Sequence, residues 1–158
     1  MGKGSFLNSP LMKQFGDERI AAGERRLVID LGACTGMDST FMGTLAGMAT
    51  RIAGNHGTLE IADIDDRGQQ SLEDLGIDAM MEIRRPGAPW SGRLDAVRAD
   101  LAPHRAPAEL PDLNGRAQHV LQAHQTLARA TPENSKRFAG VISVLRDDLA
   151  AKNHSNDS

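Results

Sequence analysis

The sequence CTGMDSTFMG, residues 34–43, decides the fold that the rest of the chain can adopt. It follows the apolar run LVIDL at 27–31, which predicts a buried strand, and it leads into residues 44–52, whose apolar side chains recur at helical spacing. Asp38 stands at the expected N-cap, because its carboxylate can accept hydrogen bonds from the free amides of a first helical turn. The pattern predicts a strand, a tight turn and a capped helix.

This arrangement places the Ser39 hydroxyl at a helix N-terminus, where aligned amides and the helix dipole favour an anion. The local backbone would therefore tolerate a phosphate group on Ser39. The alternative is that Ser39 and Thr40 are ordinary first-turn residues of a helix. Their spacing alone leaves both interpretations open.

The composition limits the classes of function. The chain has 158 residues, enough for one domain or for a small domain with an appendage. Four Phe, one Trp and no Tyr disfavour base stacking, and a formal charge of −3 disfavours binding to a nucleic-acid backbone. Cys34 is the only cysteine, so an intrachain disulfide is impossible and a reducing, cytoplasmic location is expected. No apolar run approaches the roughly 20 residues of a membrane span, and no signal-peptide pattern follows Met1.

Alternating strand and helix patterns predict an α/β sandwich whose sheet is parallel or mixed. Ser9 as N-cap and Pro10 in the first turn predict a helix over 10–22, with Gly23 as its C-cap. Asp65 is expected to cap a later helix. The other expected elements are a strand at 25–31, the helix after Asp38, a strand at 57–64, the helix capped by Asp65 at 66–75, and a short strand at 80–83.

The predicted α/β domain occupies residues 1–83, and the composition changes after it. Recurrent prolines predict a linker over 84–111 that contains one short helix near 92–101. Residues 112–152 predict an antiparallel helical hairpin, since Thr131 and Pro132 start a second helix with an apolar stripe over 138–149. Residues 153–158 are expected to form a disordered tail.

No catalytic constellation is evident, and we expect neither enzymatic activity nor a cofactor. His119 and His124 are five residues apart, which turns them away from each other on one helix. A solvent-exposed or interfacial role is therefore favoured over a zinc site. Asp63 and Asp65 begin no calcium loop, because the required glycine and terminal glutamate are absent. Cys34 has no basic neighbour in sequence, which favours a small buried side chain over a reactive thiol.

The tripeptide Asp38-Ser39-Thr40 after an apolar strand, with FMGTL opening a helix, resembles the signature of the STAS domain of sulphate transporters and anti-sigma-factor antagonists. The loop GSFLNS at 4–9 is similar to the loop beside the serine in such domains, and the resemblance covers about residues 4–83. It implies strands before this loop, and we expect these to be missing or very short in this sequence. One sheet edge would then be open, or it would be covered by the C-terminal helices or by a second subunit of a homodimer.

The resemblance also implies a function. STAS domains of this kind bind a serine-kinase anti-sigma factor and so free the sigma factor. The kinase phosphorylates the serine that matches Ser39, with Thr40 as the alternative acceptor, and a serine phosphatase restores it. The residues expected to contact the partner are Phe6, Asn8, Met37, Asp38, Ser39, Thr40 and Phe41. The same resemblance leaves a second interpretation, a non-switching scaffold or adaptor subunit of a transporter or stress-signalling assembly, in which the stripe over 138–149 docks a partner helix.

Overall fold

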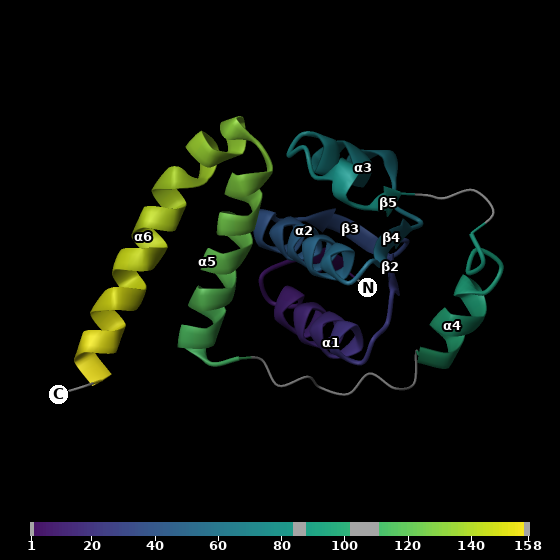
Figure 1. Ribbon diagram of the computed structural model, residues 1–158, viewed down its shortest axis with the longest axis horizontal. Helices are drawn as coiled ribbons and strands as arrows, with labels where there is room; N and C mark the ends of the chain where they lie inside the picture. The colour runs from purple at the N-terminus through teal and green to yellow at the C-terminus, as the bar shows by residue number, and fades with distance from the viewer. Residues whose placement is uncertain (1, 84–87, 102–110, 157–158) are drawn as a thin grey trace.

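The computed structural model describes residues 2–83, 88–101 and 111–156. Helices packed on parallel strands form an α/β domain, and a helical hairpin projects beside it (Figure 1). Every helix and strand predicted for the first 83 residues and for the C-terminal part is present in the predicted order, and β3 and the 3-10 helix η1 are additional. The elements are β1 (Gly2–Gly4), α1 (Ser9–Ala21), β2 (Arg26–Asp30), β3 (Cys34–Met37), α2 (Ser39–Gly54), β4 (Thr58–Ala62), α3 (Asp66–Glu73), the 3-10 helix η1 (Asp78–Met80), β5 (Glu82–Ile83), α4 (Leu94–Leu101), α5 (Leu113–Ala130) and α6 (Pro132–Asn156).

All strand pairs in the described residues are parallel, which confirms the predicted α/β class. One sheet has the order β2-β4-β5, and β1 pairs separately with β3. The predicted tight turn follows β2, where the Cys34 amide donates to the Leu31 carbonyl at 2.8 Å, but the strand β3 at Cys34–Met37, between this turn and Asp38, was not predicted. It forms a strand because β1 lies alongside it, with Gly2 opposite Cys34 and Gly4 opposite Met37. The expected short N-terminal strand is therefore present as β1.

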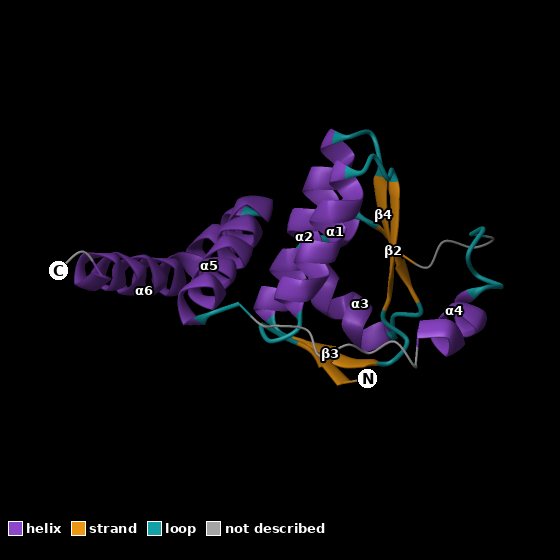
Figure 2. Cartoon of the chain, turned by 90° about the horizontal axis from the view of Figure 1, so that it is seen from below, coloured by secondary structure: helices purple, strands orange, loops and turns teal. Residues whose placement is uncertain are grey.

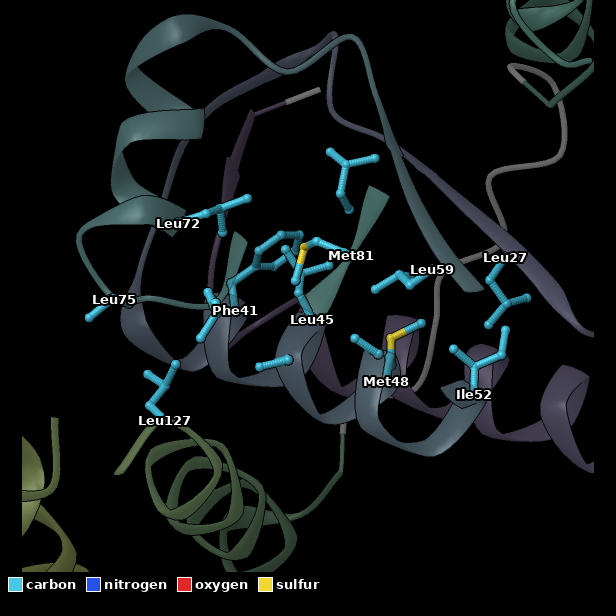
Figure 3. Close-up of a cluster of buried hydrophobic side chains, with 14 of the residues drawn as sticks. Leu27, Phe41, Leu45, Met48, Ile52, Leu59, Leu72, Leu75, Met81 and Leu127 are labelled. Carbon is cyan, nitrogen blue, oxygen red and sulfur yellow. The ribbon is translucent and has the colours of Figure 1, made fainter. Parts of the chain in front are cut away.

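Helix α2 is the centre of the hydrophobic core. Its residues Leu45, Met48 and Ile52 are fully buried against Leu59 and Ile61 of β4 (Figure 3). Strands β2 and β4 pair in register, with Leu27 opposite Leu59, so alternate side chains of both strands face α2. Burying side chains of this size contributes about 1.5–3 kcal/mol each relative to exposure. The core thus fixes the position of the α2 N-terminus relative to the sheet.

The start of α1 differs from the prediction that Ser9 is its N-cap. Asn8 occupies the cap position and Ser9 is the first helical residue. Ser9 is fully buried, and its hydroxyl bonds to His119 of α5 instead of to the backbone of its own helix. The end of α1 follows the prediction more closely. Ala22 is the C-cap residue, and Gly23 follows it with a φ of 92°.

The segment around α4 lies on the side of the β2-β4-β5 sheet that faces away from α1 and α2 (Figure 2). Glu60 of β4 is almost completely buried there, and it accepts a hydrogen bond from the indole Nε1 of Trp90. Its other oxygen pairs with Arg26 Nε at 3.0 Å. Arg98 of α4 donates to Asp30 at 2.6 and 2.7 Å and thereby lowers the pKa of that carboxyl. The predicted short helix of the linker is thus present as α4, and Arg98 ties it to Asp30 of β2. Residues 84–87 and 102–110 of that linker lie outside the described residues.

Helices α5 and α6 form the predicted antiparallel hairpin, with the Thr131 hydroxyl accepting from the Asn134 amide at the start of α6. The hairpin packs on α2 through α5, and its Leu127 and Phe138 belong to the main core. The apolar stripe over 138–149 therefore serves this chain, since Phe138 and Leu149 are buried. Helix α6 continues to Asn156, so residues 153–156 are helical and the predicted tail over 153–158 was wrong for them.

Gly43 is the point where the backbones of α2 and α5 meet. A Cβ atom added to Gly43 would lie 2.4 Å from the carbonyl oxygen of Ala123, which is too close for any side chain. One turn further along α2, a Cβ on Gly47 would lie 3.2 Å from the end of the Arg51 side chain and 3.8 Å from the Thr126 Oγ1 of α5, an ordinary contact distance. The missing side chain at 43 is thus a condition for docking of the hairpin.

We predict that Gly43→Ala loosens the hairpin although alanine favours helix by about 1 kcal/mol over glycine. The clash with the α5 backbone should cost about 1–3 kcal/mol. Hydrogen exchange should become faster across residues 113–130 and stay unchanged in β2 and β4. Gly47→Ala is the matched control and should not speed exchange in α5. Equal protection of α5 in Gly43→Ala and the unchanged protein would contradict the proposed packing.

Candidate functional site

The carboxylate of Asp38 joins two separate parts of the chain. Its Oδ1 accepts from the Phe41 amide at 2.8 Å, which confirms the predicted N-cap of α2. Its Oδ2 accepts from the Phe6 amide at 2.9 Å, 32 residues away in sequence. The Asp38 amide in turn donates to the Gly4 carbonyl at 2.9 Å. One side chain therefore caps α2 and also holds the loop after β1 beside it.

That loop, residues 5–8, is closed by its own polar groups. Asn8 accepts from the Ser5 amide at 2.8 Å and donates to the Lys3 carbonyl at 2.9 Å. The side chains of Phe6 and Leu7 remain 45% and 46% exposed. Large apolar groups left in water next to a polar helix end are typical of a surface that contacts another protein. We call Phe6, Leu7 and the neighbouring Asp38 and Ser39 the loop patch.

Ser39 is half-buried as the first residue of α2, and its hydroxyl points to the C-terminal hairpin. The distance from Ser39 Oγ to His124 Nε2 is 2.9 Å. The other ring nitrogen, His124 Nδ1, lies 2.8 Å from the Val120 carbonyl oxygen. A carbonyl only accepts, so Nδ1 carries the hydrogen, and in the neutral ring Nε2 accepts the Ser39 proton. The ring is held in place by Phe138, which packs edge-on with the centroids 5.3 Å apart.

Two residues expected on the contact surface are turned inward instead. Thr40 is 5% exposed and Phe41 is 7% exposed, because both lie on the side of α2 that packs into the core. They support the loop patch from beneath and do not form its surface. Met37 and Asp38 are half-buried, and Phe6 and Asn8 are exposed. The burial of Thr40 also makes it a poorer acceptor for a kinase than Ser39.

His119 is the second histidine that ties the hairpin to the domain. Its Nε2 lies 2.8 Å from Ser9 Oγ and 3.2 Å from Thr44 Oγ1. Burial lowers the pKa of His119, the positive charge of Lys13 on α1 lowers it further, and Asp38 opposes both effects. The interfacial role considered for both histidines is the correct one, and a solvent-exposed role is excluded by their burial.

The two histidines bond to different partners, as their separation on one helix predicts. Within the described residues, no group of three His, Cys, Asp or Glu side chains is placed to hold a metal ion. The pairing of His124 with Ser39 was missed by the sequence reasoning. The sequence carried a signal for the burial of His124 but not for its partner, because Val120, His124 and Leu127 share the helical face whose apolar members predict burial.

Replacement of Asp38 by alanine should weaken both contacts of the carboxylate. We expect a loss of about 1–2 kcal/mol in the free energy of unfolding, since a capping residue is removed. Exchange of the Phe6 and Phe41 amides should also become faster. Asp38→Asn keeps an oxygen that can cap the helix, so it should lose much less stability. The two variants are compared by urea unfolding, and equal losses would argue against a capping role.

The lowered pKa of His119 predicts that acid weakens hairpin docking. The ordinary pKa of a histidine is 6.5, and below this pH His119 binds a proton in the unfolded state. The folded state resists that protonation because its His119 pKa is lower. Stability should therefore be fully present well above 6.5 and should fall as the pH is lowered through 6.5 toward the lower pKa of the folded state. Hydrogen exchange in α5, compared between about pH 7.5 and about pH 5.5, measures this effect. His119→Gln should flatten the pH dependence, and an unchanged slope in that variant would assign the effect to another group.

Comparison with known families agrees with this geometry. The model of the family described as "Mlab, STAS domain" matches residues 2–83, which include both sheets, the loop patch and α2. No curated protein and no solved structure matches the chain. In the described part of the chain, no helix combines the length and apolar character needed to cross a membrane. The chain belongs to the STAS domain family.

Proposed function

We propose that this protein is an anti-sigma-factor antagonist, a binding module that sequesters a serine-kinase anti-sigma factor and is turned off by phosphorylation of Ser39. The observation that carries the proposal is the placement of the Ser39 oxygen at the N-terminus of α2, half-buried and beside the exposed Phe6 and Leu7. Membership of the STAS family supports it, because anti-sigma-factor antagonists are the usual context of such domains.

The loop patch has the properties that such a switch requires. Phe6 and Leu7 supply apolar area for a partner, and the Asp38 carboxylate fixes their position relative to Ser39. Phosphorylation adds about −1.5 to −2 charges and a bulky group at that point. The helix dipole accommodates the phosphate within this chain. The partner surface, once fitted to a neutral hydroxyl, loses its complementarity.

The loss of affinity on phosphorylation depends on how deeply the phosphate on Ser39 is buried against the partner. A penalty of about 3 kcal/mol corresponds to a more than hundredfold loss of affinity. The serine kinase that binds the patch would add the phosphate, and a serine phosphatase would remove it. In this scheme the signal that the protein transmits is its change in affinity for the partner.

The proposal predicts that Ser39→Ala keeps binding to a purified serine-kinase anti-sigma factor and abolishes phosphorylation. Ser39→Asp should weaken binding by about a hundredfold, because a charge enters the contact. Titration calorimetry measures both affinities. Ser135→Asp is the matched control, since Ser135 is exposed in the first turn of another helix and should leave affinity unchanged.

Equal affinities for the unchanged protein, Ser39→Ala and Ser39→Asp would contradict the switch. That result, together with recovery of a transporter ATPase or a large homomeric assembly in a pull-down, would favour the non-switching scaffold. The apolar stripe of α6 is a weak docking site for such a scaffold, because most of it already packs on α5.

A further inference from the structure

The hydrogen bond between Ser39 and His124 has a direction that bears on the chemistry of the serine. The contact of Nδ1 with the Val120 carbonyl leaves Nε2 as the acceptor, so the Ser39 proton lies between Oγ and the ring. The lone pairs of Oγ are then free to face away from α5. A serine oxygen held in this way by a histidine, with the ring oriented by a third group, is the arrangement of an activated hydroxyl.

The second serine and histidine pair provides an internal comparison. Ser9 Oγ and His119 Nε2 are 2.8 Å apart, nearly the same distance as in the first pair. Ser9 is fully buried, however, and Thr44 shares the same ring nitrogen at 3.2 Å. No reagent or enzyme could reach the Ser9 oxygen in the folded chain. The pair at Ser9 is a structural tie, whereas Ser39 is only half-buried.

We propose that His124 is the positioning residue and proton acceptor for phosphorylation of Ser39, an inference that rests on the proposed function for the source of the phosphate. In the transfer, a bond forms between Ser39 Oγ and the γ-phosphorus of ATP. The bond from that phosphorus to its bridging oxygen breaks, and ADP leaves. The hydroxyl proton moves from Oγ to His124 Nε2, so atoms and charges balance.

The same step explains how the hairpin remains docked after phosphorylation. The imidazole that has taken the proton can donate through Nε2 to an oxygen of the new phosphate. A neutral hydrogen bond is thereby replaced by a charge-assisted one, which is roughly twice as strong. Helix α5 thus contributes a residue to the switch in both states. The C-terminal extension completes the site around Ser39 and is more than an appendage to the STAS domain.

A fluorophosphonate reagent tests this proposal on the full chain without a kinase or partner. The reagent forms a bond from phosphorus to Oγ and expels fluoride, so it demands the same proton transfer to Nε2. Ser39 should react about a hundredfold faster than the exposed Ser91 and Ser135, because a positioned base contributes about 10²–10⁴. Peptide mass spectrometry over a time course gives the rate at each serine in the unaltered protein.

Two variants separate proton transfer from hairpin docking. His124→Gln keeps a group that can accept a hydrogen bond but cannot take the proton, so labelling of Ser39 should slow by about a hundredfold. Exchange protection of α5 shows whether the hairpin remains docked. His119→Gln should leave the Ser39 rate unchanged.

The proposal is overturned if His124→Gln labels at the unchanged rate. It is also overturned if Ser39 in the unaltered protein reacts no faster than Ser91, a comparison that needs no variant. Either result leaves the anti-sigma-factor binding experiment untouched. Equal affinities of Ser39→Ala and Ser39→Asp for the anti-sigma factor would instead contradict the proposed function.

Discussion

The structure depends on one carboxylate that serves two backbone segments at once. Asp38 receives the Phe41 amide of α2 and the Phe6 amide of the loop after β1. Because each oxygen is committed to a different segment, the helix end and the loop cannot move independently. The exposed apolar side chains of the loop are therefore held at a fixed place relative to Ser39. The Asp38 side chain therefore caps its own helix and also fixes the position of a surface loop that is distant in sequence.

The C-terminal hairpin is integrated with this site through close backbone contact. Gly43 lets α5 approach α2, and the approach brings His119 and His124 to hydroxyl groups of α1 and α2. Leu127 and Phe138 bury their side chains in the same core as the centre of α2. Removal of the polar ties alone would leave this apolar contact in place. The hairpin is accordingly a part of the folded domain that also reaches its functional surface.

Features set by local chemistry were predictable from the sequence. The β2 strand, the Asp38 and Asp65 caps and the restart at Thr131 all arise from neighbouring residues, and the structure confirms them. Features that depend on distant residues were not predictable. The β3 strand forms by pairing with β1. The Ser9 hydroxyl does not cap its helix, because it bonds to His119, 110 residues later in the sequence.

The same division applies to the candidate site. The position of Ser39 at the helix start follows from the motif, and its bond to His124 could not be read from spacing. The inward orientation of Thr40 and Phe41 follows from the way α2 is rotated about its axis against the sheet. The sequence at the start of the helix mixes polar and apolar residues, so it does not show which side of the helix faces the core. Phosphorylation and the identity of the partner remain predictions.

The distance in sequence between Ser39 and His124 has a consequence for biosynthesis. The pair spans 85 residues, so a ribosome adding about 5–20 residues per second completes the STAS portion several seconds before the histidine exists. During that interval the nascent domain carries its serine without the ring that orients it. Closure of such a long loop is entropically costly and is expected late in folding. The serine would gain its histidine partner only after α5 has been synthesised.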